Sequence, residues 1–119
     1  MTSYKVVLTS PFKSCVRHLG KRYPHIKDDV RVAVNTLLQE PRLGIVIPGG
    51  SGVRKLRVRN SDVRRGKSGG YRLLYLVDEQ PEPTLRLVFI YSKSDREDVT
   101  RQELQGLLTR VIEDNDGNE

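Results

Sequence analysis

A short segment of this 119-residue sequence concentrates the residue types that bind phosphate. Residues 54–72 contain eight lysines and arginines against one acidic residue and sum to +7, whereas the whole chain carries +6. Such a cluster repels itself and is stabilised by contact with a polyanion. A solvated basic face without a partner is the alternative, but scattered lysines fit it better than arginines, whose planar guanidinium matches phosphate geometry. The basic residues of this segment are Arg54, Lys55, Arg57, Arg59, Arg64, Arg65, Lys67 and Arg72.

The spacing of these cations predicts two strands that present several of them on one side. In the stretch VRKLRVR, apolar residues alternate with cations, which predicts a strand over 53–59. Its cations Lys55, Arg57 and Arg59 then project from one face of a sheet. In the next strand, YRLLYLV, alternation places Arg72 on a face that it shares with apolar residues.

The connection between these two strands, NSDVRRGKSGG, interleaves cations with glycines. Glycine permits tight turns and lets a ligand approach the backbone closely. Taken alone, the segment is equally compatible with a hairpin loop whose glycines serve the turn and whose charges serve solubility. Together with the cations of the flanking strands, it predicts one concave cationic surface.

Patterns in the rest of the chain predict the elements that position this surface. Ser10 is the expected N-cap of a first helix, with Pro11 at its first position. Thr100 and Glu103 fit a capping box at the start of the last helix. The expected elements are a strand over 4–8, helices over 10–20 and 25–39, strands over 53–59, 71–77 and 85–91, and a helix over 100–112.

This order, β-α-α-β-β-β-α, predicts an α+β fold with a small antiparallel-rich sheet, an N-terminal helical hairpin and a C-terminal helix. We expect the helices to pack on one face of the sheet. Residues 1–112 form a single domain in this interpretation, and residues 113–119, EDNDGNE, form an acidic, disordered tail.

The runs VRKLRV, GKSGGYRLLYLV and LVFIYSKSDREDVT together resemble the RelE/ParE superfamily of bacterial toxins, most closely its RelE/HigB branch. The upstream KRYPHIKDDV…LLQEPRLG also fits that branch, so the resemblance covers roughly residues 12–108. It implies a RelE-like fold and the toxin of a type II toxin–antitoxin system. Such a toxin is a metal-independent endoribonuclease without a cofactor, which cleaves messenger RNA on the ribosome by attack of the 2′-hydroxyl.

The resemblance also implies which residues form the site. The two strand cations of the family fall on Lys55 and Arg57, its GYR arginine on Arg72, and the loop lysine of HigB-like proteins on Lys67. The sequence departs from the family where Ser94 and Thr100 replace an expected arginine and an expected tyrosine. The general base and acid therefore stay unassigned among Lys55, Tyr91 and Lys93, and RNA-binding roles are expected for Arg54, Arg59, Arg64 and Arg65.

The expected partners are a cognate antitoxin protein, the ribosome and messenger RNA, with a monomeric free toxin that forms a hetero-oligomer with its antitoxin. A single cysteine, no apolar run near 20 residues and no signal-peptide pattern predict a cytoplasmic protein without a membrane partner. Two alternatives stay open: a ParE-like inhibitor of DNA gyrase, and a non-catalytic module that binds RNA or the ribosome.

Several other residues are expected to be structural. His18 and His25 are expected on the surface, away from the cationic strands, and Cys15 on an apolar helical stripe. Asp95, Glu97 and Asp98 are interpreted as an acidic cluster at a helix N-terminus, where the helix dipole favours them.

Overall fold

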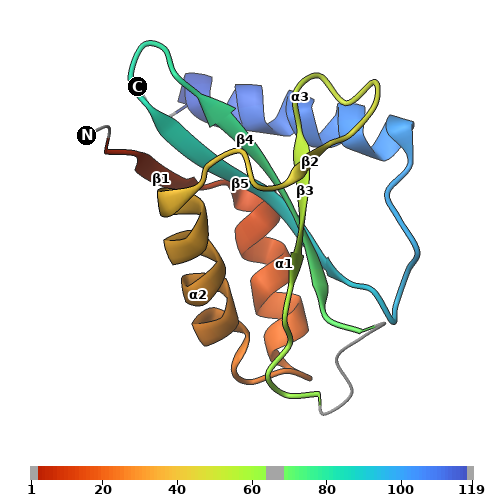
Figure 1. The fold of residues 1–119 in the computed structure, drawn as a ribbon. Coiled ribbons are helices and arrows are strands. Elements are labelled where there is room, and N and C mark those ends of the chain that lie inside the picture. The colour runs from red at the N-terminus through yellow and green to blue at the C-terminus, as the bar shows by residue number, and fades with distance from the viewer. Residues whose placement is uncertain (1–2, 64–68, 118–119) are drawn as a thin grey trace.

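A computed structural model describes residues 3–63 and 69–117 of the chain. Its strands form one five-stranded sheet in the order β1-β5-β4-β3-β2 (Figure 1). In chain order the elements are β1 (Lys5–Leu8), α1 (Ser10–Gly20), α2 (Ile26–Gln39), β2 (Ile45–Val46), β3 (Arg54–Val58), β4 (Tyr71–Asp78), β5 (Thr84–Ser92) and α3 (Arg101–Gly117).

The sheet is mixed but mostly antiparallel, which confirms the predicted α+β class. Strands β2 to β5 pair antiparallel with their neighbours in sequence. At the other edge β1 pairs parallel with β5, from Lys5 opposite Thr84 to Leu8 opposite Leu87. The two-residue strand β2 was missed by the sequence analysis, because a strand this short carries no readable alternation.

Helices cover both faces of the sheet, so the expectation of helices on one face is wrong. Figure 1 shows α1 and α2 on one side and α3 on the other. The reason lies in β4, where the consecutive residues Leu73 and Leu74 point to opposite faces and are both fully buried. A strand that is apolar on both faces needs an apolar layer on each.

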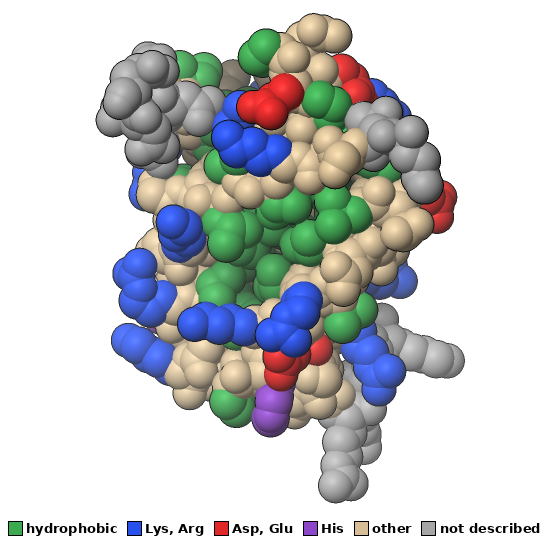
Figure 2. Space-filling model, turned by 90° about the vertical axis from the view of Figure 1, so that its left-hand side faces the viewer, with side chains coloured by type: hydrophobic (Ala, Val, Ile, Leu, Met, Phe, Trp, Pro, Cys, Tyr) green, Lys and Arg blue, Asp and Glu red, His purple; other side chains and the backbone are tan. Residues whose placement is uncertain are grey.

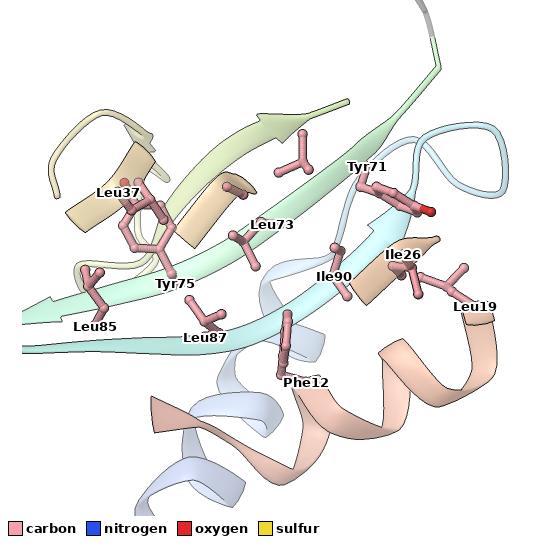
Figure 3. Packing of buried hydrophobic residues seen from close by; sticks show 12 residues of the cluster. Phe12, Leu19, Ile26, Leu37, Tyr71, Leu73, Tyr75, Leu85, Leu87 and Ile90 are labelled. Atoms are coloured by element: carbon pink, nitrogen blue, oxygen red, sulfur yellow. The ribbon is translucent and has the colours of Figure 1, made fainter. Parts of the chain in front are cut away.

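The larger core lies between the sheet and the α1–α2 pair (Figure 3). Phe12 and Leu19 of α1 and Ile26 and Leu37 of α2 pack onto it, at the helical spacing that the sequence predicts. Each such side chain contributes about 1.5–3 kcal/mol on full burial. On the other face, α3 packs Leu104, Leu107 and Val111 against Val53, Leu74 and Val88.

Helix ends differ from the prediction in two places. The N-cap of α1 is Thr9 rather than Ser10, because the Thr9 hydroxyl accepts from the Phe12 N–H and also donates to the Leu87 carbonyl oxygen. Helix α3 continues to Gly117, so the segment expected to be disordered from residue 113 is helical as far as residue 117. No proline or glycine interrupts the chain between 112 and 117, and Gly117 is the first stop signal.

The capping box at the start of α3 is confirmed. The Thr100 hydroxyl accepts from the Glu103 N–H at 3.0 Å, and a Glu103 carboxylate oxygen accepts from the Thr100 N–H at 2.9 Å. Within residues 3–63 and 69–117, none of the helices combines the length and the apolar character that crossing a bilayer requires.

Candidate functional site

Three neighbouring strands bring Arg57, Arg72 and Tyr91 into one row across the sheet. Arg57 of β3 lies opposite Arg72 of β4, which lies opposite Tyr91 of β5. Side chains at paired positions point to the same face, with their Cβ atoms about 5 Å apart. The next row, Lys55, Leu74 and Phe89, lies on the same face, and there α3 covers Leu74. The cationic cluster of Lys55, Arg57 and Arg72 therefore lies beside α3.

Among the described residues, no acidic side chain neutralises the two arginines of this row. Within the described part of the chain, neither Arg57 nor Arg72 forms an ion pair. Arg72 donates only to backbone oxygens, those of Tyr71 at 3.2 Å and Gly69 at 3.4 Å. Like charges directly opposite one another destabilise a sheet. A phosphate placed between the two guanidinium groups would remove that repulsion.

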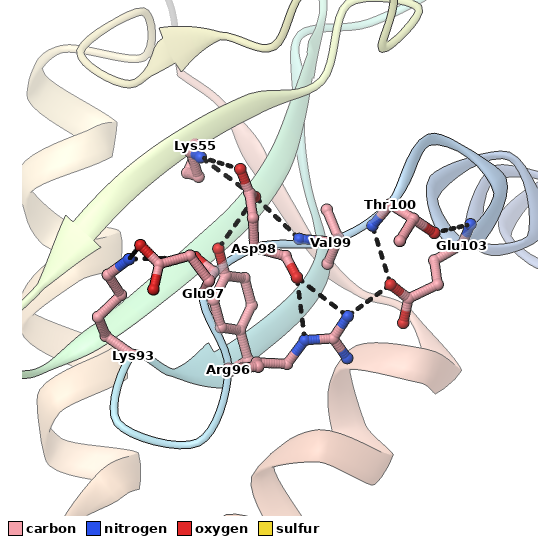
Figure 4. A network of polar contacts seen from close by, with 9 residues as sticks. Lys55, Lys93, Arg96, Glu97, Asp98, Val99, Thr100 and Glu103 are labelled. Carbon is pink, nitrogen blue, oxygen red and sulfur yellow. Dashed lines mark hydrogen bonds and ion pairs between the residues drawn. The ribbon is translucent and has the colours of Figure 1, made fainter.

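Beside the arginines, Asp98 links a lysine to a tyrosine (Figure 4). Both carboxylate oxygens of Asp98 accept from Lys55 Nζ at 3.2 Å. Oδ1 also accepts from the Tyr91 hydroxyl at 3.3 Å and from the Val99 N–H at 2.8 Å. Strand β3 and the distant pair of β5 and the turn after it therefore meet at one carboxylate.

The surroundings of Asp98 and Tyr91 shift the pKa values of these two groups in opposite directions. Burial raises the pKa of Asp98, but hydrogen bonds from the Val99 N–H and from Lys55 outweigh it, so its net pKa lies below the usual value. Burial, followed by the adjacent Asp98 carboxylate, raises the pKa of Tyr91 to about 12. At neutral pH, Asp98 is therefore an ionised carboxylate that accepts hydrogen bonds, and Tyr91 is a neutral phenol that donates one to it.

The turn that carries Asp98 is held by a further set of ion pairs. The Arg96 guanidinium donates to the Asp98 carbonyl oxygen, pairs with Glu103 and lies 5.6 Å from the centre of the Tyr91 ring. Lys93 pairs with Glu97 at 3.0 Å, four residues on. These contacts fix the path of the chain between β5 and α3 and so position the carboxylate.

The interpretation of Asp95, Glu97 and Asp98 as a helix-terminal cluster is wrong, because α3 begins at Arg101. Each of the three carboxylates instead pairs with a cation: Asp95 with Arg22 at 2.6 Å, Glu97 with Lys93 and Asp98 with Lys55. Lys93 and Glu97 are four residues apart, so their ion pair is a local contact that the sequence could suggest. No local pattern signals the contact of Asp98 with Lys55, because it depends on the pairing of β3 with β4 and β4 with β5.

The structure brings together four of the residues that the sequence nominates, namely Lys55, Arg57, Arg72 and Tyr91. Lys93 follows at the same end of β5, where its N–H donates to the Gly70 carbonyl oxygen. The remaining nominated residues are Arg54, Arg59, Arg64, Arg65 and Lys67.

Arg54 and Arg59 lie apart from the row. Arg54 alternates with Lys55 and so lies on the opposite face, where its guanidinium donates to the carbonyl oxygens of Arg42 and Gly44 at 3.0 and 2.8 Å. Arg59 is exposed and, with Arg57, lines a groove of about 480 Å³ between α2 and β3. The nominated residues 64, 65 and 67, two arginines and a lysine, lie outside the described residues.

The described ends of the β3–β4 connection are tied down. Gly70 has φ +80°, and a Cβ there would lie 2.6 Å from the Val58 carbonyl oxygen, so only glycine fits. At the other end, Asp62 accepts from the His25 N–H at 2.9 Å and lies 2.6 Å from His25 Nδ1. Asp29 accepts from the Ser61 N–H and hydroxyl. The N-terminal turn of α2 thereby holds the start of the connection.

Ser94 and Thr100, where the resembled family has an arginine and a tyrosine, have structural contacts instead. The Ser94 hydroxyl is 2.9 Å from that of Ser92, and Thr100 caps α3. Both histidines are exposed, as expected, and lie outside the cationic cluster. Among the described residues, no group of three or more His, Cys, Asp or Glu side chains is arranged to hold a metal ion.

The sequence was also compared with models of known protein families, and none of them matches it.

Proposed function

We propose that this chain is the toxin of a type II toxin–antitoxin system and cleaves messenger RNA on the ribosome, in the manner of the RelE/HigB proteins that its sequence resembles. The observation that carries the proposal is the pairing of the exposed Arg57 with the half-buried Arg72, which have no acidic partner among the described residues and lie beside the Lys55–Asp98–Tyr91 contacts. A cognate antitoxin that holds the toxin inactive belongs to the same proposal.

In this proposal the arginine pair binds the phosphate at which the chain is cut. Attack by the 2′-hydroxyl produces a phosphorane that carries more negative charge than the substrate. Two guanidinium groups held on neighbouring strands stabilise that charge without having to reorganise. The nucleophile belongs to the RNA, so the reaction requires no cofactor to generate it.

Proton transfers are assigned to Asp98 and Lys55. The Asp98 carboxylate takes the proton of the 2′-hydroxyl as the 2′-oxygen bonds to phosphorus, and Lys55 protonates the 5′-oxygen as its bond to phosphorus breaks. The products are a 2′,3′-cyclic phosphate and a 5′-hydroxyl. Because Asp98 and Lys55 are in direct contact, the proton on Asp98 returns to Lys55 and restores both groups. Tyr91 stays protonated and holds Oδ1 of Asp98 in place.

A non-catalytic module that binds RNA or the ribosome is the second candidate. It is favoured by the structural roles of Ser94 and Thr100, which leave no replacement for the arginine and the tyrosine of the resembled family. The same cations would then only neutralise phosphates. Inhibition of DNA gyrase, as in ParE proteins, is the third.

The test is primer extension on a reporter messenger RNA after a pulse of expression, which compares the intact chain with Arg72→Ala and Asp98→Asn. We expect ribosome-dependent cuts within translated codons, and a loss of roughly 100-fold or more in cleavage rate for each variant. Arg110→Ala, an exposed arginine on α3, is the control and should cut normally. Ribosome binding should be largely retained in all three.

Growth arrest without cuts would contradict the nuclease proposal and favour gyrase inhibition. Absence of both arrest and cuts, with ribosome affinity reduced in Arg72→Ala, would favour the binding module. Cuts that persist in Asp98→Asn but not in Arg72→Ala would keep the nuclease and reject the assigned base.

A further inference from the structure

An apolar groove of about 740 Å³ lies between β1, α1 and α2, at the edge of the sheet remote from β3 (Figure 2). Its floor is formed by Val6 and Leu8 of β1, Val16 of α1, and Val30 and Val34 of α2. Leu8 is 43% exposed and the four valines are half-buried, so the floor is open to solvent. Figure 2 shows this face, with hydrophobic side chains in a hollow and cations to its left and below it. Soluble proteins expose few contiguous apolar surfaces that have no partner.

The rim of this groove is cationic on both long sides. Lys13 and Arg17 lie four residues apart on α1, and Lys27 and Arg31 lie four residues apart on α2. Arg31 pairs with Asp28 at 3.1 Å, while Lys13, Arg17 and Lys27 form no ion pair with any described residue. The groove therefore combines an apolar floor with two parallel rows of positive charge.

We infer that this groove binds an acidic amphipathic helix of a partner protein, with an apolar stripe on Val16, Val30 and Val34 and acidic side chains against the rows on both rims. The lining residues of α2, from Lys27 to Val34, span about 10 Å along the helix axis, which is two turns. A helix that lies in the groove presents apolar residues at three- and four-residue spacing, flanked by glutamate or aspartate on each side.

Two other occupants fit less well. The acidic C-terminal residues 113–119, EDNDGNE, match the rim but contain no apolar side chain for the floor. A second copy of the chain would bring its own net charge of +6 against two cationic rows. The inference does not depend on the proposed nuclease activity, because the groove shares no residue with the Arg57–Arg72–Tyr91 row.

The test uses the full chain and a synthetic 16-residue helical peptide with leucines at heptad a and d positions and glutamates on both flanks. Binding is measured by fluorescence anisotropy, and the site is located from amide chemical shifts. We expect binding that shifts the amides of Val16, Val30 and Val34. Reversal of one cation on each rim, in the double variant Arg17→Glu with Lys27→Glu, should weaken binding at least tenfold.

Controls separate the groove from general attraction to a basic protein. The double variant Lys21→Glu with Arg110→Glu reverses two exposed cations outside the groove lining and should bind within about twofold of the intact chain. Leu8→Asn changes a half-exposed floor residue, so the fold tolerates it, and should weaken binding severalfold. A peptide with lysines in place of the glutamates should not bind.

Four results would overturn the inference. The first two are a lysine peptide that binds as tightly as the glutamate peptide, and an Arg17→Glu, Lys27→Glu variant that binds the glutamate peptide as tightly as the intact chain. The third is a chain that sediments as a dimer until those two cations are reversed. The fourth is a marked gain in peptide affinity when residues 113–119 are deleted. The last two would assign the groove to a second copy and to the chain's own C-terminus.

Discussion

Tyr71 and Tyr75 lie on the same face of β4 and are both fully buried, yet their hydroxyl groups differ in their partners. The Tyr75 hydroxyl donates to the Pro41 carbonyl oxygen and accepts from the buried Gly44 N–H, each at 2.8 Å. The buried Tyr71 hydroxyl finds no hydrogen-bond partner among the described residues, and burial raises the pKa of this phenol well above its usual value. An unpaired buried hydroxyl costs free energy, whereas a paired one does not.

Replacement of each tyrosine by phenylalanine should therefore have unequal effects. Tyr75→Phe leaves the Gly44 N–H unpaired and should lower the free energy of unfolding by about 1–3 kcal/mol. Tyr71→Phe removes an unpaired hydroxyl and should leave stability unchanged or raise it by up to about 1 kcal/mol. Urea denaturation of the two variants at pH 7 measures both effects. Equal losses would show that the Tyr71 hydroxyl has a partner in solution.

At the residue scale, alternation within a strand was the reliable guide. It predicts correctly that Tyr71 and Tyr75 face the core and that Arg72 shares a face with Leu74. It cannot predict Asp98, whose contact with Lys55 joins residues 43 positions apart through two strand pairings. The missed carboxylate lies in a turn, where no periodicity constrains the direction of a side chain.

At the scale of elements, the start of the β3–β4 connection is joined to the N-terminus of α2 by the His25–Asp62 pair. The hydrogen bond between the His25 side chain and Asp62 raises the pKa of His25. The hydrogen bonds from His25 lower the pKa of Asp62. A raised histidine pKa stabilises the fold at pH values below 6.5, the ordinary pKa of histidine. This stabilisation is lost as the pH rises through the folded-state pKa. A lowered aspartate pKa stabilises the fold at pH values above 3.8, the ordinary pKa of aspartate. This stabilisation is lost as the pH falls through the folded-state pKa.

The pair should therefore stabilise the protein most between pH 3.8 and 6.5. We expect His25→Ala to lower the urea midpoint more at pH 5.5 than at pH 9. His18→Ala, which removes an exposed histidine without an ion pair among the described residues, should show a smaller difference between the two pH values. An effect of His25→Ala that is the same at both pH values would mean that the ion pair does not form in solution.

The elements themselves were largely predictable, and their layering less so. Apolar stripes at helical spacing identify α1, α2 and α3, and the consecutive Leu73 and Leu74 already signal a strand buried on both faces. The helix on the second face was not predicted, because the alternating cations of β3 suggest that this face is open to solvent. In the structure α3 covers part of the face, and only the part beside α3 is open. The parallel partner of β1 was not predictable, since Lys5 and Thr84 lie far apart in the sequence and no local pattern connects them.

At the scale of the whole molecule, two of the surfaces on which described cations gather lie apart from each other. One is the row of Arg57 and Arg72 on β3 and β4, and the other is the rim of the groove between α1 and α2. A net charge of +6 attracts any polyanion, but only phosphates held at specific cations give a fixed number of contacts.

Salt dependence separates these contributions. Binding of a 2′-O-methylated RNA, which has no free 2′-hydroxyl for the reaction, should weaken linearly on a log–log plot against salt concentration. Arg57→Ala should make the slope shallower by about 0.7, the value for one phosphate contact on a single strand. Arg110→Ala should leave the slope unchanged, and a slope that Arg57→Ala does not alter would place the RNA elsewhere.

Because synthesis proceeds from the N-terminus, β1 is made well before its parallel partner β5. The nascent chain therefore presents α1 and α2 without the strands that complete their core, and the sheet closes only when β5 has left the exit tunnel. Asp98 follows β5 in the chain, so Lys55 has no carboxylate partner until the residues as far as Asp98 have been synthesised. A chain that ends before Asp98 therefore lacks the carboxylate that joins Lys55 to Tyr91.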